Sequence, residues 1–285
     1  MTVNEKDTER FLKAGSVRIR YHEAGSGEPL VLLHGGGPGA SGWSNYSRNV
    51  EVLAKSFHVL VPDLPGFGGS DKCLPEDRLF TYLAGVVNDF MATLGIGAAH
   101  FVGNSLGGGT VLKLALDHPE RVRKAVLMGS GGGLPMFSTM PTEGVKHLLG
   151  YYEGAGPSLE KLRAFIDVML YDGSAVTEQL LQQRFKASLD PEVVRNPPIR
   201  RRAGRMPLED LWREELTRLD HDMLLIWGRE DRVVPLDCAM VLLKQLRRGQ
   251  LHVFPQCGHW VQWEKAAEFN ALIAGFFKSS KGATQ

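Results

Sequence analysis

The sequence predicts a doubly wound α/β fold, with a mostly parallel sheet and a helical cap inserted into it. Short apolar segments alternate with longer segments of helical periodicity over most of the 285 residues. Several of the short segments, such as LVLL at 30–33, are apolar throughout, which is typical of strands buried on both faces of a parallel sheet. A repeated strand–helix order implies right-handed crossovers and helices on both faces of the sheet.

Seven segments have the length and apolar content of strands. They are residues 17–23, 29–34, 57–62, 99–104, 124–128, 223–227 and 250–254. Helical periodicity falls between them, at residues 43–54, 80–94, 106–117, 236–246 and 263–277.

The alternation stops between about residues 134 and 216, where no convincing buried strand is found. This part contains helical stretches at 143–152, 159–170, 176–188 and 208–219. We therefore expect a core formed by residues 1–134 and 216–285, and a helical cap, or lid, formed by residues 135–215.

Composition and charge exclude several classes of protein. The formal net charge is only +1, so neither a nucleic-acid partner nor a polybasic membrane surface is indicated. The charged N-terminal segment lacks the apolar centre of a signal peptide, and glycines and prolines interrupt the longest uncharged stretch, 125–142. The three cysteines form no CxxC pair, which disfavours disulfides and zinc sites. We expect a cytoplasmic protein with reduced thiols, no membrane association, no metal and no cofactor.

Glycine is over-represented, at 33 of 285 residues against a usual share of about 7%. Many of these glycines lie in four short stretches, 35–42, 66–69, 103–109 and 129–133, each directly after a predicted strand. In a parallel sheet the loops that follow strands form the binding edge. The glycines therefore predict tightly turned backbone around a site.

The segment Gly103-Asn104-Ser105-Leu106-Gly107 is a GxSxG motif. The motif alone is common, but here it joins an apolar strand to a helical segment. In that setting the glycines allow a sharp turn that projects the serine hydroxyl above the sheet. A serine that only caps the following helix is the structural alternative. We predict that Ser105 is a nucleophile.

A serine nucleophile needs a base, and the base needs an orienting acid. Asp231 follows the predicted strand at 223–227, and His259 follows the next one. The chain order Ser, Asp, His is that of the α/β-hydrolase triad. Glu230 and Asp237 are competing candidates for the acid. The glycine-rich segment after residue 34 can offer amide N–H groups which, with that of Leu106, would form an oxyanion hole.

Taken together, the segments HGGGPGASGWSNYSRN, DLPGFGGSDK, GNSLGGGT, WGREDRVVPLD and CGHWVQWE resemble those of the meta-cleavage product hydrolases. This family of α/β-hydrolases breaks a carbon–carbon bond in the dienoates that ring-opening dioxygenases produce from aromatic compounds and steroids. The resemblance extends over nearly the whole chain, and several segments are most similar to those of actinobacterial steroid-degrading members.

The resemblance implies roles for individual residues. Ser105 would be the nucleophile, His259 the base and acid, and Asp231 the orienting carboxylate, while Gly36 and Leu106 would supply the oxyanion amides. The polar end of the dienoate would be bound by Gly35, Gly37, Asn45, Asn104, Arg184 and Trp260. Arg184 can pair with a carboxylate, and Trp260 offers an indole N–H.

We expect an apolar acyl pocket, built largely from the cap. Its candidate residues are Phe137, Met140, Phe165, Met169, Phe185, Trp212 and Val234. Arginines crowd the second half of the cap, and a solvated surface or electrostatic steering of an anionic substrate would each explain them. They are Arg195, Arg200, Arg201, Arg202 and Arg205.

The predicted function is therefore hydrolysis of a carbon–carbon bond in a small-molecule 2-hydroxy-6-oxohexa-2,4-dienoate, by a homodimer or homotetramer. A carboxylesterase of the same fold and a ligand receptor that retains the triad are the alternatives, since a fold does not fix a function.

Overall fold

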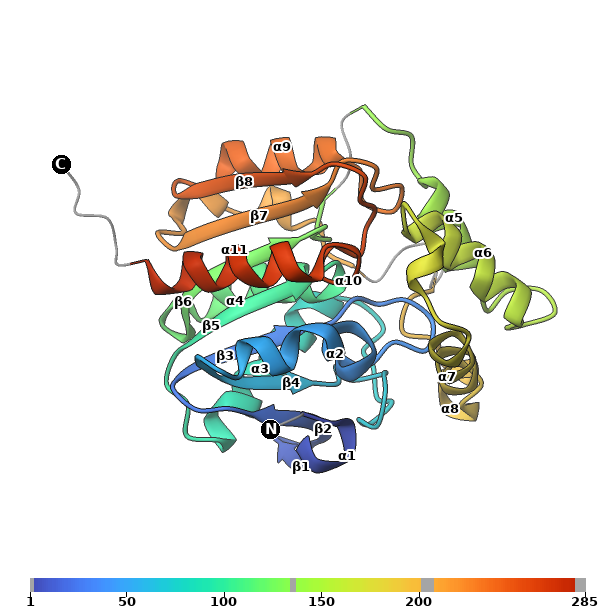
Figure 1. Cartoon of the computed structure of the whole chain (residues 1–285), viewed down its shortest axis with the longest axis horizontal. Coiled ribbons are helices and arrows are strands. Elements are labelled where there is room, and N and C mark those ends of the chain that lie inside the picture. Colours follow the sequence, from blue (N-terminus) through green and yellow to red (C-terminus); the bar gives the residue numbers. More distant parts are fainter. Residues whose placement is uncertain (1–2, 134–136, 201–207, 280–285) are drawn as a thin grey trace.

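The computed structural model describes residues 3–133, 137–200 and 208–279. Eight strands form one sheet in the order β1-β2-β4-β3-β5-β6-β7-β8 (Figure 1). The strands are β1 (Glu9–Ala14), β2 (Val17–Ala24), β3 (Glu28–Leu33), β4 (Phe57–Pro62), β5 (Ala99–Asn104), β6 (Val122–Met128), β7 (Asp222–Gly228) and β8 (Gly249–Phe254).

The seven predicted strands are confirmed, and β1 is the one that the sequence pattern did not reveal. From β4 through β8 all neighbouring strands are parallel, whereas β1 and β2 pair antiparallel at one edge. Most of the side chains of β1 are exposed or half-exposed, so the strand has no apolar run to detect.

Helices cover both faces of the sheet, as predicted. They are α1 (Glu5–Thr8), α2 (Gly42–Leu53), α3 (Leu79–Thr93), α4 (Leu106–Asp117), α9 (Leu236–Gln245), α10 (Val261–Glu264) and α11 (Ala266–Lys278), with a short 3₁₀ turn η1 (Pro119–Arg121). The helix predicted at 263–277 is two helices, because Lys265 has φ −122° and ψ 42°, outside the helical range.

Strand alternation divides the interior into two apolar cores. Leu127 and Leu225 face one side of the sheet with α3, α4 and α9, while Val126 and Ile226 face the other side with α2 and α11. Figure 1 shows α2 and α11 on the face toward the viewer. Because central strands bury both faces, they read as continuous apolar runs in the sequence.

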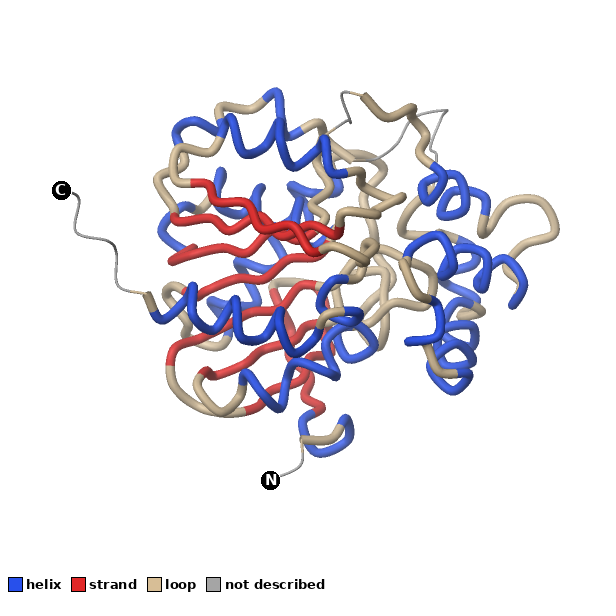
Figure 2. Tube along the Cα trace, turned by 45° about the horizontal axis from the view of Figure 1, so that its top comes forward, coloured by secondary structure: helices blue, strands red, loops and turns tan. Residues whose placement is uncertain are grey.

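Between β6 and β7 the described residues contain helices and no strand. The helices are α5 (Glu143–Gly150), α6 (Leu159–Met169), α7 (Glu178–Ser188) and α8 (Pro191–Arg195), with 3₁₀ turns η2 (Gly173–Ala175), η3 (Leu211–Arg213) and η4 (Leu216–Arg218). Helices α5 to α8 lie together beyond one end of the sheet (Figure 2). Their own apolar core includes Phe165 and Leu181, and it extends to Trp260 of the sheet domain.

The helix predicted at 208–219 is wrong, since this segment forms only η3 and η4. Asp210 caps η3 through the N–H of Trp212, and Glu214 has extended backbone that ends the turn. The N–H of Leu211 also donates to Gly132 O at 2.7 Å. Its leucines therefore pack against the sheet domain without forming a long helix.

Within the described ranges, no helix combines the length and the apolar character that a membrane crossing requires.

Candidate active site

Ser105 lies at a sharp turn between β5 and α4. Its backbone has φ 52° and ψ −110°, a conformation that L residues adopt only when the surroundings enforce it. A side chain on Gly103 would meet Gly107 O at 2.4 Å, and one on Gly107 would meet Leu33 O at 2.3 Å, so the turn requires both glycines. Ser105 makes no side-chain capping bond to α4, which removes the capping explanation for the motif.

His259 and Asp231 form a buried hydrogen-bonded pair. The distance from Nδ1 of His259 to Oδ2 of Asp231 is 2.7 Å. Because a carboxylate only accepts, Nδ1 carries the proton, and Nε2 is left as the basic nitrogen. The other oxygen of Asp231 accepts from the amides of Val233 at 2.8 Å and Val234 at 2.9 Å. The carboxylate is therefore fixed on both sides.

The two competing acids face other partners. Glu230 accepts from the N–H of Cys257 at 3.0 Å and forms an ion pair with Arg229. Asp237 accepts from the N–H of Phe137 at 2.7 Å. Of the three candidates, Asp231 is the one that contacts the histidine.

Gly129 at the end of β6 leaves room for this pair. Its φ is +49°, and a Cβ there would lie 2.8 Å from Nδ1 of His259 and 3.2 Å from Oδ2 of Asp231. Both the backbone conformation and the space therefore require glycine.

The loop that carries His259 is attached to the inserted helices. The N–H of His259 donates to Met169 O at the end of α6, at 2.7 Å. Glu264 accepts from the N–H of Gly258 and from that of Tyr171, each at 2.8 Å. Burial raises the pKa of Glu264, although the backbone donors oppose this shift. These contacts couple the position of the imidazole to that of α6.

The glycine-rich loop after β3 lies beside Ser105. A Cβ on Gly35 would be 3.4 Å from that of Ser105, and one on Gly36 would be 3.3 Å from Cδ2 of Leu106. Leu106 is the first residue of α4, so its N–H has no partner within the helix. The amides of Gly36 and Leu106 therefore belong to neighbouring backbone segments at the serine, as an oxyanion hole requires.

His34 holds this loop, a role that the sequence reading missed. The N–H of Leu64 donates to Nε2 at 2.9 Å, so Nδ1 carries the proton and donates to Gly35 O at 2.8 Å. Burial lowers the pKa of His34, which keeps the ring neutral.

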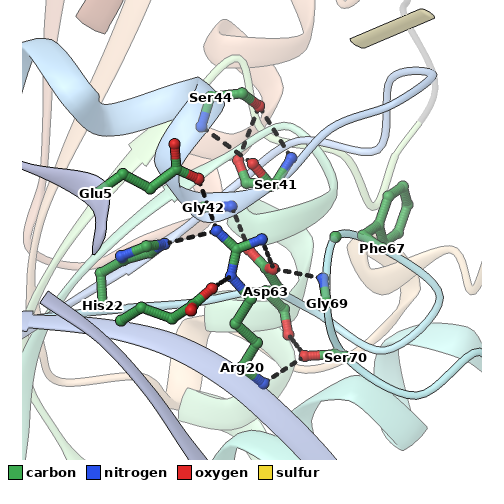
Figure 3. A network of polar contacts seen from close by, with 12 residues as sticks. Glu5, Arg20, His22, Ser41, Gly42, Ser44, Asp63, Phe67, Gly69 and Ser70 are labelled. Carbon is green, nitrogen blue, oxygen red and sulfur yellow. Dashed lines mark hydrogen bonds and ion pairs between the residues drawn. The ribbon is translucent and has the colours of Figure 1, made fainter. Parts of the chain in front are cut away.

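Asp63 holds the start of α2 and the loop that follows β4 (Figure 3). Its buried carboxylate accepts from the N–H of Gly42 at 2.7 Å and from that of Gly69 at 2.8 Å. Arg20 lies 3.7 Å from it, and Ser70 donates to its backbone carbonyl at 2.7 Å. Asp63 could not be recognised from the sequence, because a lone aspartate after a strand forms no pattern.

Asn45, Arg184 and Trp260 meet on one wall of the site. The indole of Trp260 donates to Oδ1 of Asn45 at 2.9 Å, and Asn45 donates in turn to Ser41 O. The Arg184 guanidinium lies over the indole, with Cζ 4.9 Å from the ring centroid.

Arg184 is buried and only partly satisfied. Its Nε and one terminal nitrogen donate to Pro38 O at 3.0 and 2.9 Å, whereas the buried Nη1 has no hydrogen-bond partner among the residues that the structure describes. Burial lowers its pKa to about 10, so the side chain stays charged at neutral pH. Because a buried charge is costly unless it is paired, Nη1 is a candidate donor to an anionic group of a ligand.

The amide nitrogen of Asn104 donates to the protein backbone. It donates to Met128 O at 3.3 Å and to His259 O at 3.4 Å, and it thereby links β5 to the histidine loop.

One cavity of about 320 Å³ contains these groups. Its lining includes Ser105, Leu106 and His259, the three glycines 35–37, and all four polar candidates Asn45, Asn104, Arg184 and Trp260. Asp231 lies behind His259 and does not line the cavity.

Four of the seven apolar candidates line this cavity, namely Met140, Phe165, Met169 and Val234. The other three do not. Phe137 is 86% exposed, Phe185 packs against the core of the inserted helices, and the ring of Trp212 lies against Gly133. The lining instead contains Phe80, Val145, Leu148, Ile199 and Leu208, whose spacing in the sequence resembles that of ordinary core residues. Among the arginines of the cap, Arg195 is exposed and Arg200 is half-buried, while Arg201, Arg202 and Arg205 lie outside the described residues.

The sheet, the serine turn and the His–Asp pair define an α/β hydrolase, and the profile described as Alpha/beta hydrolase family matches residues 30–272. Within that class, the chain belongs to the meta-cleavage product hydrolases.

Relatives that match nearly the whole chain support its assignment to this family. The chain is 45% identical to the 2-hydroxy-6-oxo-6-phenylhexa-2,4-dienoate hydrolase of Comamonas testosteroni, over 97% of this chain and 94% of the relative. It is 42% identical, with the same coverage, to the 2-hydroxy-6-oxononadienedioate/2-hydroxy-6-oxononatrienedioate hydrolase of that organism. Among solved structures, the meta-cleavage product hydrolase from Pseudomonas fluorescens IP01 is 35% identical, with a TM-score of 0.84 over 96% of this chain and 98% of its own.

Proposed function

We propose that this chain hydrolyses a carbon–carbon bond in 2-hydroxy-6-oxohexa-2,4-dienoates, releasing 2-hydroxypenta-2,4-dienoate and a carboxylic acid. The names of its relatives support this class of reaction. The observation that carries the proposal is the buried Nη1 of Arg184, which has no hydrogen-bond partner in the described part of the chain and belongs to a residue lining the same cavity as Ser105 and His259. An ordinary esterase has no need of a buried cation there, whereas a dienoate brings a carboxylate to pair with it.

The polar wall would bind one end of the substrate. The carboxylate would accept from Nη1 of Arg184, and the 2-hydroxy or 2-oxo group would lie near Asn45 and Trp260. The Trp260–Asn45 hydrogen bond, 2.9 Å long, keeps both side chains in place before substrate arrives. A preorganised polar wall costs little reorganisation when an anion binds.

The first chemical stage would be conversion of the dienol to its keto tautomer. His259, with its basic Nε2, would move the proton from the 2-hydroxyl group toward C5. The carbon leaving group is then a delocalised dienolate, which is far easier to expel than a bare carbanion.

In the second stage Ser105 would attack the C6 carbonyl while His259 takes its proton. The amides of Gly36 and Leu106 would stabilise the oxyanion of the tetrahedral intermediate. Its collapse breaks the C5–C6 bond and leaves an acyl-serine, and the dienolate takes up a proton. Water, activated by His259, then releases the carboxylic acid and restores the serine.

We propose residues 135–215 as the cap and residues 1–134 with 216–285 as the catalytic core. The contacts of Met169 and Tyr171 with the histidine loop support a cap that helps to complete the site. A homodimer or homotetramer, a cytoplasmic location and a seco-steroid acyl group stay predictions.

Replacing the nucleophile tests the proposal. Ser105→Ala should abolish turnover of a coloured dienoate and retain it as a bound, visibly absorbing complex. Full activity of that variant would remove Ser105 from the mechanism. Turnover of simple esters by the wild-type enzyme, without any binding of dienoate, would favour a carboxylesterase.

A further inference from the structure

The carboxylate of Glu264, at the end of α10, takes no part in the chemistry proposed above. It follows His259 by five residues. One oxygen, Oε1, accepts from the N–H of Gly258 at 2.8 Å. The other, Oε2, accepts from the N–H of Tyr171 at 2.8 Å and from that of Asp172 at 3.4 Å. Each oxygen therefore serves a different segment, one in the loop between β8 and α10 that carries His259, the other just after α6.

The two segments that Glu264 joins are also the two that hold the backbone of the base. Gly258 directly precedes His259, and the N–H of His259 donates to Met169 O at 2.7 Å. Tyr171 follows Met169 by two residues. The carboxylate thus adds a second link beside the hydrogen bond that attaches His259 to the end of α6.

The histidine loop is packed closely between the sheet and the end of α6. A Cβ on Gly258 would lie 2.5 Å from Met169 O, and one on Gly228, at the end of β7, would lie 2.0 Å from Gly258 O. Gly258 has no side chain to anchor it in this narrow space. Its hydrogen bond to Glu264 therefore fixes the orientation of the backbone just before the base.

A second carboxylate contacts the same loop from the sheet domain. Oε2 of Glu230 accepts from the N–H of Cys257 at 3.0 Å, and Oε1 pairs with Arg229 at 2.7 Å. These contacts join the loop to the residues that follow β7. Glu264, in contrast, joins it to the inserted helices, which also carry Arg184.

We propose that Glu264 is a positioning residue for the reaction. By joining the histidine loop to the end of α6, it sets the placement of Nε2 of His259 relative to the hydroxyl of Ser105. Glu264 does not line the cavity, so it acts through His259 and not on the substrate. This inference rests on the proposed function and adds a residue on which its proton transfers depend, because a base must lie within hydrogen-bond distance of the proton that it takes.

The role requires a carboxylate, because two oxygens must accept at the same time. Glu264→Gln keeps the size of the side chain but leaves one acceptor oxygen. Whichever way the amide turns, its NH₂ group faces a backbone N–H, and one of the two links is lost. We expect kcat for the dienoate to fall about 10-fold, because small displacements of a catalytic group are costly. The circular dichroism spectrum should match that of the wild-type enzyme.

Substrate binding should change little, because the polar wall has supports of its own. Trp260 donates to Oδ1 of Asn45 at 2.9 Å, and Arg184 donates to Pro38 O. The Kd of the coloured dienoate complex, measured in Ser105→Ala with and without Glu264→Gln, reports binding apart from turnover. We expect the two Kd values to agree within about twofold. Loss of kcat at constant Kd is a result that a merely structural role would not give.

Glu230→Gln is the matched control, because an amide oxygen can keep its single contact with Cys257. Its kcat should stay within about twofold of the wild-type value. Gly258→Ala tests the link from the other side, since the new Cβ would push against Met169 O while Glu264 stays intact. It should lower kcat at least as much as Glu264→Gln.

The positioning role is wrong if folded Glu264→Gln keeps the wild-type kcat, if Glu230→Gln loses as much, or if Kd rises in parallel with the loss of kcat. In each case the proposed function stands. Should Glu264→Gln not fold, an unchanged kcat in Gly258→Ala would overturn the inference. If the wild-type enzyme itself leaves the dienoate coloured, the proposed function fails, and this inference fails with it.

Discussion

The guanidinium of Arg184 lies over the indole of Trp260, with 4.9 Å between Cζ and the ring centroid, and both side chains are buried. Arg184 comes from α7, and Trp260 directly follows His259. The contact therefore joins an inserted helix to the histidine loop at the point where we expect the substrate carboxylate. Binding of substrate and alignment of the base are thus physically connected.

Replacing Arg184 tests the anion contact. Arg184→Met keeps much of the apolar stem but removes the charge, so we expect a loss of about 100-fold in kcat/KM for the dienoate. Arg184→Lys keeps a charge but loses the planar donor set, and it should fall between wild type and Arg184→Met. Steady-state kinetics measure both, and unchanged kcat/KM in the Met variant would contradict the assignment. Its folding should be retained, because the substitution removes a costly buried charge and keeps an apolar side chain of similar length.

Asp231→Asn should lower kcat by about 10³–10⁴-fold while substrate binding changes little. The amide nitrogen would face Nδ1 of His259 and favour the wrong tautomer, even though the oxygen that accepts from Val233 and Val234 can be retained. Glu230→Gln serves as the matched control, because Glu230 faces Cys257 and not the imidazole. If the two variants lose kcat equally, the assignment of Asp231 as the acid that orients His259 is contradicted.

Gly129→Ala should reduce both activity and stability. The new Cβ would lie 2.8 Å from Nδ1 of His259, so the ring must move. Gly95→Ala is the control, because Gly95 has a similar φ of +69° with nothing within 4 Å of a Cβ. Each variant should lose about 1–2 kcal/mol of unfolding free energy from backbone strain, but only Gly129→Ala should lose most of its kcat. Chemical denaturation and kinetics separate the two effects, and full activity of Gly129→Ala would contradict the packing argument.

Stability should fall as the pH drops below about 6.5, the ordinary pKa of histidine. Burial lowers the pKa values of His22, His34 and His100, so the unfolded chain binds more protons than the folded one in this range. The stability that these neutral rings contribute is complete above the unfolded pKa and is lost as the pH falls toward the lower folded pKa. Thermal unfolding at pH 7.5 and 5.5 measures the change. A midpoint that is equal or higher at pH 5.5 would contradict it.

The sheet could be predicted from the sequence because its central strands are buried on both faces and therefore appear as apolar runs. The edge strand β1 was not predicted, because its side chains are mostly exposed and form no apolar run. The segment 208–219 has the periodicity of a helix but does not form one, because the hydrogen bond from Leu211 to Gly132 arises only in the folded chain and local periodicity does not reveal it.

The candidate site was predictable to the extent that it lies in loops directly after strands. Ser105, Asp231 and His259 each occupy such a position, and the structure brings them to one place. The apolar pocket was harder, because Phe80 and Leu148 have the spacing of ordinary core residues, whereas Phe137 proved to be exposed. His34 and Asp63 each hold their loops through two hydrogen bonds to backbone groups, and such bonds leave no pattern in the sequence.

Hydrolysis of the carbon–carbon bond is tested most directly by incubating a 6-substituted 2-hydroxy-6-oxohexa-2,4-dienoate with wild-type enzyme in ¹⁸O-labelled water. We expect multiple-turnover loss of visible absorbance, with 2-hydroxypenta-2,4-dienoate and a carboxylic acid in equal amounts and solvent oxygen in the acid. If the colour of the dienoate persists with excess substrate while a simple ester is hydrolysed under the same conditions, carbon–carbon bond hydrolysis is contradicted.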